Sequence, residues 1–299
     1  METHDLSHTG LAPASRPAHV KSASRALDII EGLAAEPDGL AFTELARRQA
    51  IPKSSLHALL TVLTDRGYVV LDTERRTYGL GIRTWEIGQT WATQRTLVDL
   101  AIPMMQRVVR EINETAQLAV LDGIENVYLA KVDCSHPIRL QSEVGKRLYA
   151  HATGLGKVLL SAQTDDDLRA RYAGHPFPQV ESSPIRSLDH LLQVVAAVRE
   201  RGFAVDDQEY TPGLRCVAVP VHDGGHQVVA AVSAAIPLMR AGPEQLSNAL
   251  RTIAAASIDL SRALGSTEPD PRLVDLTGWE GDVLATARDE TDRRGTGSQ

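Results

Sequence analysis

A short amphipathic stretch near the N-terminus carries residues whose types and spacing suit hydrogen bonding to nucleic acid. Leucines recur at helical spacing on one side of residues 53–65, so this side is expected to be buried: they are Leu56, Leu59, Leu60 and Leu63. The other side begins with Lys53, Ser54, Ser55 and His57. Such side chains near a helix N-terminus can reach base edges and phosphates in a major groove. A simply solvated polar face would have the same pattern, and the sequence leaves that alternative open.

Two arginines follow this helix in a charged turn. Residues 68–80 are rich in Val, Tyr and Thr and predict two short strands around Asp72–Arg76. At the tip of this hairpin, Arg75 and Arg76 could neutralise phosphates or enter a minor groove.

The elements that must position these groups are two further helices. Apolar residues at helical spacing predict the first over residues 23–34, and the turn signal EPDG ends it. A shorter helix follows, with Thr43 as its possible cap, and Ile51-Pro52 breaks it. Three helices and a β-hairpin are the outline of a winged helix-turn-helix over residues 20–81.

A second candidate site is the stretch HATGLGKVLL, residues 151–160, a turn with two glycines that opens onto a helix. Exposed backbone N–H groups at such a helix start can hold a carboxylate. The stretch is not a nucleotide loop, because His151 and Val158 break the Walker pattern and Leu159 breaks the dinucleotide pattern.

Two other chemistries are weighed for the second half. A metal site could be imagined from His151, Asp206, Cys216, His222 and His226. Zinc geometry is demanding, and His222 and His226 flank a Gly-Gly turn, so we expect them to be solvated hairpin residues and expect no metal or other cofactor. Cys216 could be a nucleophile, but no His–acid pair is readable beside it, which disfavours an enzyme.

Composition limits the class of protein. The 299 residues suffice for two domains, and the net charge of −7 does not by itself indicate a nucleic-acid binder. The charge is uneven, because residues 20–83 carry nine Lys/Arg against eight Asp/Glu, so the acidic excess lies elsewhere. Two cysteines, the lack of a secretory signal and the lack of a long apolar run predict a cytoplasmic protein without a membrane partner.

The remaining segments complete the predicted organisation. Residues 1–19 are expected to be a disordered arm, and residues 266–299 a disordered tail. Residues 82–95 predict a linker helix, whose Trp85 and Trp91 are expected to pack at a dimer interface. Alternating strand and helix patterns fill residues 96–265.

Sequence motifs in both halves resemble the IclR family of bacterial transcriptional regulators. The motifs that show this resemblance lie within residues 20–264 and are KSASRALDIIEGLAAEPDGLAFTELARRQAIPKSSLHALL, LYAHATGLGKVLLS and DDQEYTPGLRCVAVPV. The resemblance implies an α+β protein with an N-terminal winged helix-turn-helix, a linker helix and a C-terminal GAF-like α/β effector-binding domain. It also implies a homodimer or homotetramer that binds double-stranded operator DNA.

The resemblance also suggests site residues. The family's pocket for small organic acids matches Gly154, Leu155, Asp206, Cys216 and Ser233. Two departures stand out: Ala58 replaces an arginine of many members, and Ala235 replaces a serine of some. The predicted DNA contacts are Thr43, Arg47, Lys53, Ser54, Ser55, His57, Arg75 and Arg76.

The sequence therefore predicts a ligand-responsive, DNA-binding transcriptional regulator, a repressor of a catabolic operon controlled by a small organic acid. Two alternatives remain at this stage. One is a small-molecule sensor whose helical head binds protein, and the other is a cytosolic enzyme built on the α/β half.

Overall fold

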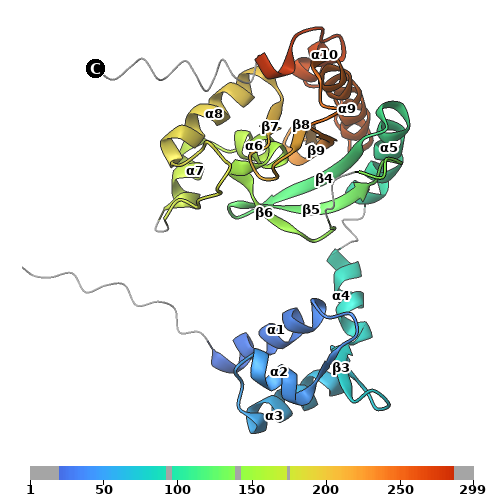
Figure 1. Ribbon diagram of the computed structural model, residues 1–299, viewed down its shortest axis with the longest axis vertical. Coiled ribbons are helices and arrows are strands. Elements are labelled where there is room, and N and C mark those ends of the chain that lie inside the picture. The colour runs from blue at the N-terminus through green and yellow to red at the C-terminus, as the bar shows by residue number, and fades with distance from the viewer. Residues whose placement is uncertain (1–19, 92–95, 139–142, 174–175, 286–299) are drawn as a thin grey trace, which may run out of the picture. The chain divides into compact units, whose positions relative to one another are not determined.

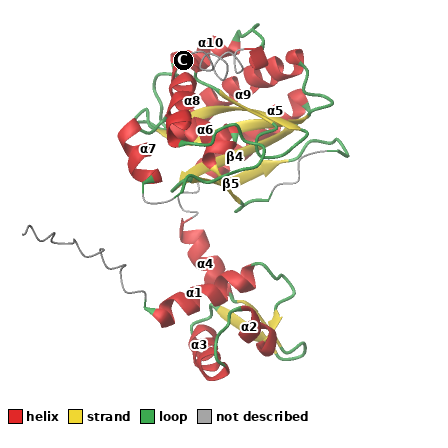
Figure 2. Ribbon diagram, turned by 60° about the vertical axis from the view of Figure 1, so that its left-hand side comes forward, coloured by secondary structure: helices red, strands yellow, loops and turns green. Residues whose placement is uncertain are grey.

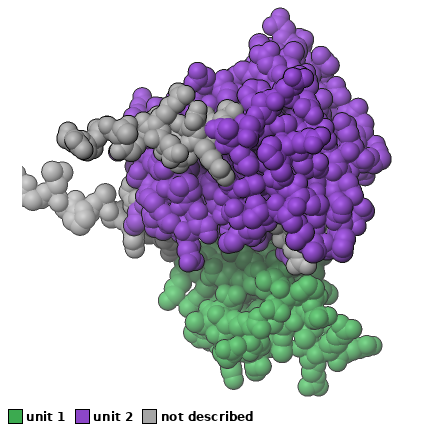
Figure 3. Space-filling model, turned by 45° about the horizontal axis from the view of Figure 1, so that its top comes forward, with its two compact units in different colours: residues 1–94 green, residues 95–299 purple. Residues whose placement is uncertain are grey.

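The computed structural model describes residues 20–91, 96–138, 143–173 and 176–285. The chain divides into two compact units, residues 1–94 and residues 95–299, coloured separately in Figure 3. The predicted arm, residues 1–19, lies outside the described residues. Within the described ranges, no helix has the length and apolar character needed to cross a membrane.

The first unit is a small helical domain with a three-stranded sheet (Figure 1). Its elements in chain order are α1 (Lys21–Ala34), β1 (Leu40–Ala41), α2 (Phe42–Arg48), α3 (Lys53–Asp65), β2 (Val69–Asp72), β3 (Thr77–Leu80) and α4 (Ile82–Trp91). The predicted hairpin is β2–β3, and β1 adds a short third strand to β3, giving the order β1-β3-β2. This is the winged helix-turn-helix arrangement that the sequence predicts.

The leucines of α3 hold this unit together. Leu56 and Leu60 are buried against Ile29 and Leu33 of α1 and Leu45 of α2. The helix ends as predicted, because Gly67 has a φ of +76°, a conformation that glycine adopts without steric cost.

The expected cap at Thr43 is wrong. The α2 helix begins at Phe42, two residues earlier than a cap at Thr43 would place it, so Ala41 is its N-cap and no side chain caps it. Thr43 instead lies exposed in the first turn of α2.

The second unit is built on a six-stranded antiparallel sheet. Its strands are β4 (Thr115–Asp122), β5 (Glu125–Val132), β6 (Arg147–Tyr149), β7 (Ala204–Asp207), β8 (Leu214–His222) and β9 (Val228–Pro237). Their order in the sheet is β6-β5-β4-β9-β8-β7. The predicted turn at Gly224-Gly225 joins β8 to β9, whose strands pair along most of their length.

Helices cover both faces of this sheet (Figure 2). The helices α5 (Thr96–Ile112) and α9 (Pro243–Ala263) pack on one face, together with alternate strand residues such as Val217 and Val219. The helices α6 (Gly154–Ser161) and α8 (Leu188–Arg201) pack on the other face, where Ala218 and Ala231 point. A short helix, α7 (Asp165–Tyr172), connects α6 with the segment that leads to α8.

The expectation of a disordered tail is wrong for residues 266–285. This segment forms the helix α10 (Pro271–Thr277), and Leu273, Leu276 and Val283 are buried in the same core as α5 and α9. These few side chains pack against the apolar surface of α9. The polar composition of the segment does not predict this packing. Residues 286–299 lie outside the described residues.

Candidate functional sites

The outer face of α3 presents the predicted DNA-contact residues to solvent. Lys53, Ser54 and His57 are exposed and Ser55 is half-buried. On the opposite side three of the four leucines are buried, and Leu59 is half-buried. The first turn of α3 contains no acidic residue, and no side chain caps it. The N–H groups of this first turn and the lysine therefore give the face a positive end, which suits an incoming phosphate.

Arg47 is exposed, but its guanidinium is already paired. It donates from Nη2 to Glu44 Oε1 at 2.6 Å and from Nε to Glu44 Oε2 at 3.0 Å. Arg48 shares the same carboxylate, with 2.6 Å between its Nε and Glu44 Oε1. The hydrogen bonds from Arg47 and then Arg48 lower the pKa of Glu44 to about 2. Since the pair is solvent-exposed, Arg47 can exchange this partner for a phosphate at small cost.

Arg75 and Arg76 lie exposed in the turn of the β2–β3 hairpin. Asp72 orders this turn, because its Oδ1 accepts the backbone N–H of Glu74 at 2.9 Å and that of Arg75 at 3.0 Å. Arg76 has a φ of +53°, which completes the reversal of the chain. The Asp72 carboxylate thus holds the turn through backbone N–H groups, and it also forms an exposed ion pair with Arg75, with 3.9 Å between Asp72 Oδ2 and Arg75 Nε. Because this pair is exposed, Arg75 can exchange it for a phosphate at small cost.

In the second unit, the fold brings the predicted effector residues to one face of the sheet. Asp206 of β7 stands opposite Cys216 of β8, and Ser233 of β9 stands opposite Ala218, the next β8 residue on the same face. Gly154 packs against these strands: a methyl group at its Cα would lie 3.6 Å from Asp206 N and 3.7 Å from Cys216 O. The start of α6 therefore lies directly over Asp206 and Cys216.

The start of α6 offers free backbone donors. Thr153 is its N-cap, and the Thr153 hydroxyl accepts the N–H of Gly156 at 3.0 Å and donates to Asn126 Oδ1 at 2.8 Å. The N–H groups of Gly154 and Leu155 belong to the first turn, where a helix supplies no acceptor of its own. Their positions suit a carboxylate.

A small cavity of about 40 Å³ lies beside this helix start. Its wall contains two of the predicted residues, Asp206 and Cys216, but not Gly154, Leu155 or Ser233. The other lining residues are Gln117, Tyr128, Lys146, Leu148, Thr153, Tyr210, Thr211 and Leu214. Sequence reasoning missed these, although Gln117 could have been found from the alternation of β4, which places it on the same face as Ser233.

A buried ion pair lies next to Asp206, which is one of the residues that line the cavity. Lys157 of α6 donates from Nζ to Glu209 Oε1 at 2.5 Å and to the Val205 carbonyl, and both charged residues are almost fully buried. The N–H of Glu209 in turn donates to Asp206 Oδ1 at 2.8 Å. Burial, followed by the nearby charge of Glu209, raises the pKa of Asp206 to about 7, so Asp206 can both donate and accept hydrogen bonds near neutral pH.

Comparisons with known proteins match both units. The model of the bacterial transcriptional regulator IclR C-terminal domain matches residues 89–262, and that of the IclR helix-turn-helix domain matches residues 22–73. The chain belongs to the IclR family. The transcriptional regulator XynR of Escherichia coli (strain K12) is 32% identical over 246 residues, which cover 82% of this chain and 98% of XynR.

Solved structures of IclR-family proteins share the fold. A transcriptional regulator from Rhodococcus sp. RHA1 is 28% identical with a TM-score of 0.70, covering 82% of this chain and 98% of that protein. An IclR homologue from Microbacterium hydrocarbonoxydans, complexed with 4-hydroxybenzoate, has a TM-score of 0.70 at 23% identity and covers 81% of this chain and 98% of its own. This chain is thus an IclR-type transcriptional regulator with a DNA-binding and an effector-binding domain.

The enzyme alternative is accordingly wrong: the relatives of this IclR-family chain are regulators. The surroundings of Cys216 agree, because burial, and after it the charge of Asp206, raises the pKa of its thiol well above the ordinary value. A thiol so protonated is a poor nucleophile. Cys216 is a small wall residue of the effector domain.

One expectation about the histidines of the second unit is wrong. Among the described residues, no group of three or more potential ligands is close enough to hold a metal ion. His226 is exposed as expected, but His222 is buried, with its Nε2 3.6 Å from Asp270 Oδ2. The turn exposes His226, whereas the unexpected C-terminal segment covers His222.

His151 is fully buried in an aromatic cluster, and this burial predicts that the protein loses stability at acid pH. Its ring lies 4.8 Å from that of Phe177, and neither ring nitrogen has a hydrogen-bond partner among the described residues. Burial, followed by the charge of Lys157, lowers its pKa from 6.5 to about 4. The folded state therefore favours the neutral ring. The resulting contribution to the free energy of unfolding is complete above about pH 6.5 and is lost as the pH falls toward 4.

We expect the burial of neutral His151 to make the free energy of unfolding roughly 2 kcal/mol lower at pH 5 than at pH 7.5. Replacing His151 with phenylalanine should remove this part of the pH dependence, and denaturant unfolding at both pH values measures it. The exposed His226 serves as the control, since His226→Asn should leave the dependence unchanged. A pH dependence that survives in His151→Phe would contradict the assignment.

Proposed function

We propose that the protein regulates transcription by inserting α3 into the major groove of operator DNA while the β2–β3 wing contacts the flanking backbone. The observation that carries this proposal is the two-sidedness of α3. Its leucines are buried in the first unit, and Lys53, Ser54 and His57 remain exposed without an acidic neighbour in the first turn. Thr43, Arg47, Ser55, Arg75 and Arg76 complete the proposed contact set, with the arginines on phosphates.

Replacing Ser55 and His57 with alanine together is expected to weaken specific operator binding by roughly 30-fold or more. Each side chain that reads a base edge contributes about 1–3 kcal/mol of discrimination. Fluorescence anisotropy on the DNA upstream of the gene and on a scrambled duplex measures specific and non-specific binding separately. Thr64→Ala, at the exposed C-terminal end of α3, is the control. Unchanged specific affinity in the double variant would sink the recognition-helix proposal.

We further propose that a small organic acid is the effector. Its carboxylate would accept from the N–H groups of Gly154 and Leu155, and Asp206 would hydrogen-bond to a hydroxyl or oxo group. Cys216 and Ser233 would lie beside it, and the Ser233 hydroxyl is buried without a partner among the described residues. The small volume of the cavity, about 40 Å³, favours a short acid. Melting-temperature shifts of the full chain with pyruvate, lactate and 4-hydroxybenzoate test this, since a ligand of the native state raises its stability.

We propose repression of a catabolic operon as the outcome. Related proteins carry such roles in their names, including the acetate operon repressor of Salmonella typhimurium, which is 28% identical over 250 residues. An acid that binds one arrangement of the protein better than another would shift its operator affinity. Loss of the gene should raise expression of the adjacent operon, whereas a fall would indicate an activator.

We also propose that the protein is a homodimer or homotetramer. In α4, Ile82 is 67% exposed, Trp85 60% and Ile87 46%, and Leu80 lines the same hollow as Ile82 and Trp85. A cluster of this kind on a monomer would be costly to hydrate, so a second copy is its natural cover. Trp91 belongs to the same helix, but its side chain lies outside the described residues.

Replacing Ile82 and Trp85 with serine is expected to shift the protein toward the monomer. Light scattering coupled to size exclusion measures the molar mass. The exposed Val274 of α10 provides a control substitution of an apolar residue away from this face. If the double variant kept the wild-type mass, the oligomer would have to use another surface.

A further inference from the structure

The segment of residues 266–285 lies beyond the part of the chain that the family models match. The IclR C-terminal model ends at residue 262. The alignment with XynR accounts for 98% of that relative but only 82% of this chain. The segment nevertheless packs as an ordered part of the second unit.

Apolar contacts fix the segment to one side of the sheet. Leu273, Leu276 and Val283 are almost completely buried, and the Trp279 ring meets that of Phe203 edge-on at a centroid distance of 5.8 Å. Two hydrogen bonds from α9 secure its far end: Arg251 Nη1 donates to Trp279 O and Ser247 Oγ to Gly281 O, each at 2.8 Å.

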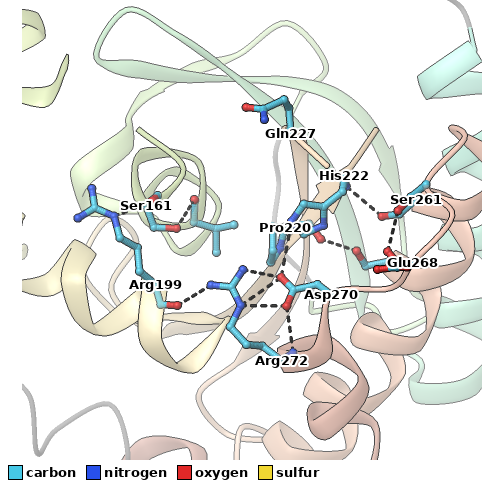
Figure 4. A network of polar contacts seen from close by, with 12 residues as sticks. Ser161, Arg199, Pro220, His222, Gln227, Ser261, Glu268, Asp270 and Arg272 are labelled. Carbon is cyan, nitrogen blue, oxygen red and sulfur yellow. Dashed lines mark hydrogen bonds and ion pairs between the residues drawn. The ribbon is translucent and has the colours of Figure 1, made fainter. Parts of the chain in front are cut away.

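Polar contacts tie the near end to α8 (Figure 4). Asp270 caps α10 and accepts three side-chain hydrogen bonds from Arg272, two from Nε at 2.9 and 3.2 Å and one from Nη2 at 2.5 Å. The same guanidinium donates from Nη1 to the carbonyl of Arg199 in the last turn of α8. The approach is close, because a methyl group on Gly202 would lie 2.7 Å from Arg272 Cβ.

Arg199 continues this connection to α6. Its Nε donates to Ser161 O, the last residue of α6, at 2.9 Å, and Nη1 pairs with Asp165 at 2.7 Å. A further hydrogen bond from Nη2 reaches the carbonyl of Gln163. Since α6 also packs along α8 through Val158 and Val198, the two helices are held at their ends and along their sides.

We propose that residues 266–285 form a C-terminal brace that positions α8 and, through Arg199, the helix α6 that opens the effector site. Arg272 is its positioning residue: it touches no effector, but it fixes the helix whose first turn would bind one. The claim that the brace orders α6 does not depend on any ligand. The claim that the brace affects effector binding rests on the proposed function.

The matched test compares two ways of loosening the brace in the full chain. Asp270→Asn/Arg272→Ala removes the link to α8 without leaving a buried, unpaired carboxylate, and asparagine still caps α10. Arg251→Ala removes one arginine-to-carbonyl hydrogen bond of the same segment, but on the α9 side. Hydrogen–deuterium exchange then reports the opening of each helix separately.

We expect the double variant to raise exchange in residues 155–161 and 190–201 about 10-fold, with β4, β9 and α9 unchanged. Arg251→Ala should leave exchange in α6 within twofold of wild type. Arg199→Ala should reproduce the α6 effect and add little to the double variant, because both act on one connection. Asp270→Asn with Arg272→Lys should restore part of the protection, since lysine can still donate to the Arg199 carbonyl.

Two results would overturn the brace. One is equal exchange of α6 in the two brace variants, which would make the segment a general stabiliser. The other is increased exchange confined to residues 266–285. A second experiment measures the melting temperatures of the same proteins with pyruvate, lactate and 4-hydroxybenzoate. An acid that raises the melting temperature of the wild type should raise that of the double variant less than that of Arg251→Ala. If none of the acids acts on the wild type, the effector proposal fails while the exchange result still decides the brace.

Discussion

Gly156→Ala is expected to destabilise the second unit by about 3 kcal/mol or more and to abolish its response to an effector. The reason is steric. A Cβ on Gly156 would lie 2.1 Å from the Ala150 carbonyl oxygen and 2.3 Å from Ala150 Cα. Both neighbours are backbone atoms of the short 3-10 helix Ala150–Ala152, so no side-chain rotation can relieve the overlap. The start of α6 must move away from this turn, and the N–H groups of Gly154 and Leu155 move with it.

Thermal unfolding measures this expectation, because a loss of 3 kcal/mol in a unit of this size lowers the melting temperature by about 6–12 °C. Gly154→Ala is the matched control. Its Cβ would make ordinary contacts at 3.5 Å or more, so the melting temperature should change little. Were Gly156→Ala to melt with the wild type, the contact between α6 and the preceding turn would have to be looser than described.

The first unit could be predicted from sequence because its signals are local. The leucines of α3 repeat at helical spacing, and their burial follows from that pattern alone. Gly67 and the charged turn at Asp72 mark the ends of elements in the same way. The pairing within α2 is equally local, because Glu44 and Arg47 are three positions apart, the spacing at which side chains on one helix meet.

The effector domain depends more on contacts that are distant in sequence. Lys157 and Glu209 read as surface charges, because charged residues are mostly exposed. The fold buries them together as a pair separated by 52 positions. His222 is a similar case, since its burial depends on Asp270 and the segment that follows α9. The residues next to His222 in the sequence do not predict that this later segment buries it.

The C-terminal segment shows why composition misleads at a domain edge. Its polar and charged residues suggest disorder, and its four buried apolar residues are too few for a clear period: Leu273, Leu276, Val283 and Leu284. They are ordered because α9 and Phe203 already present an apolar surface. Burying each such side chain contributes about 1.5–3 kcal/mol, enough to order a short segment that adds little new core of its own.

Arg75→Ala/Arg76→Ala is expected to weaken operator binding roughly 100-fold at moderate salt and to lower the salt slope of binding by about two for each protomer on the DNA. The substitution isolates the arginine charges, because Asp72 holds the turn through the backbone N–H groups of Glu74 and Arg75. Arg66→Ala is the control: this exposed cation lies at the opposite end of α3 from the proposed base contacts.

Anisotropy titrations over a series of salt concentrations separate two causes of such a loss. Phosphate contacts release counterions, so their removal must flatten the dependence of log K on log salt concentration. A loss of base contacts or a distorted α3 would lower affinity at every salt concentration with the slope preserved. A weakened double variant with the wild-type slope would therefore place the wing away from the phosphates, and α3 alone would have to supply the electrostatic attraction. That outcome is hard to reconcile with a helix face whose single lysine is its only fixed positive side chain between residues 53 and 65.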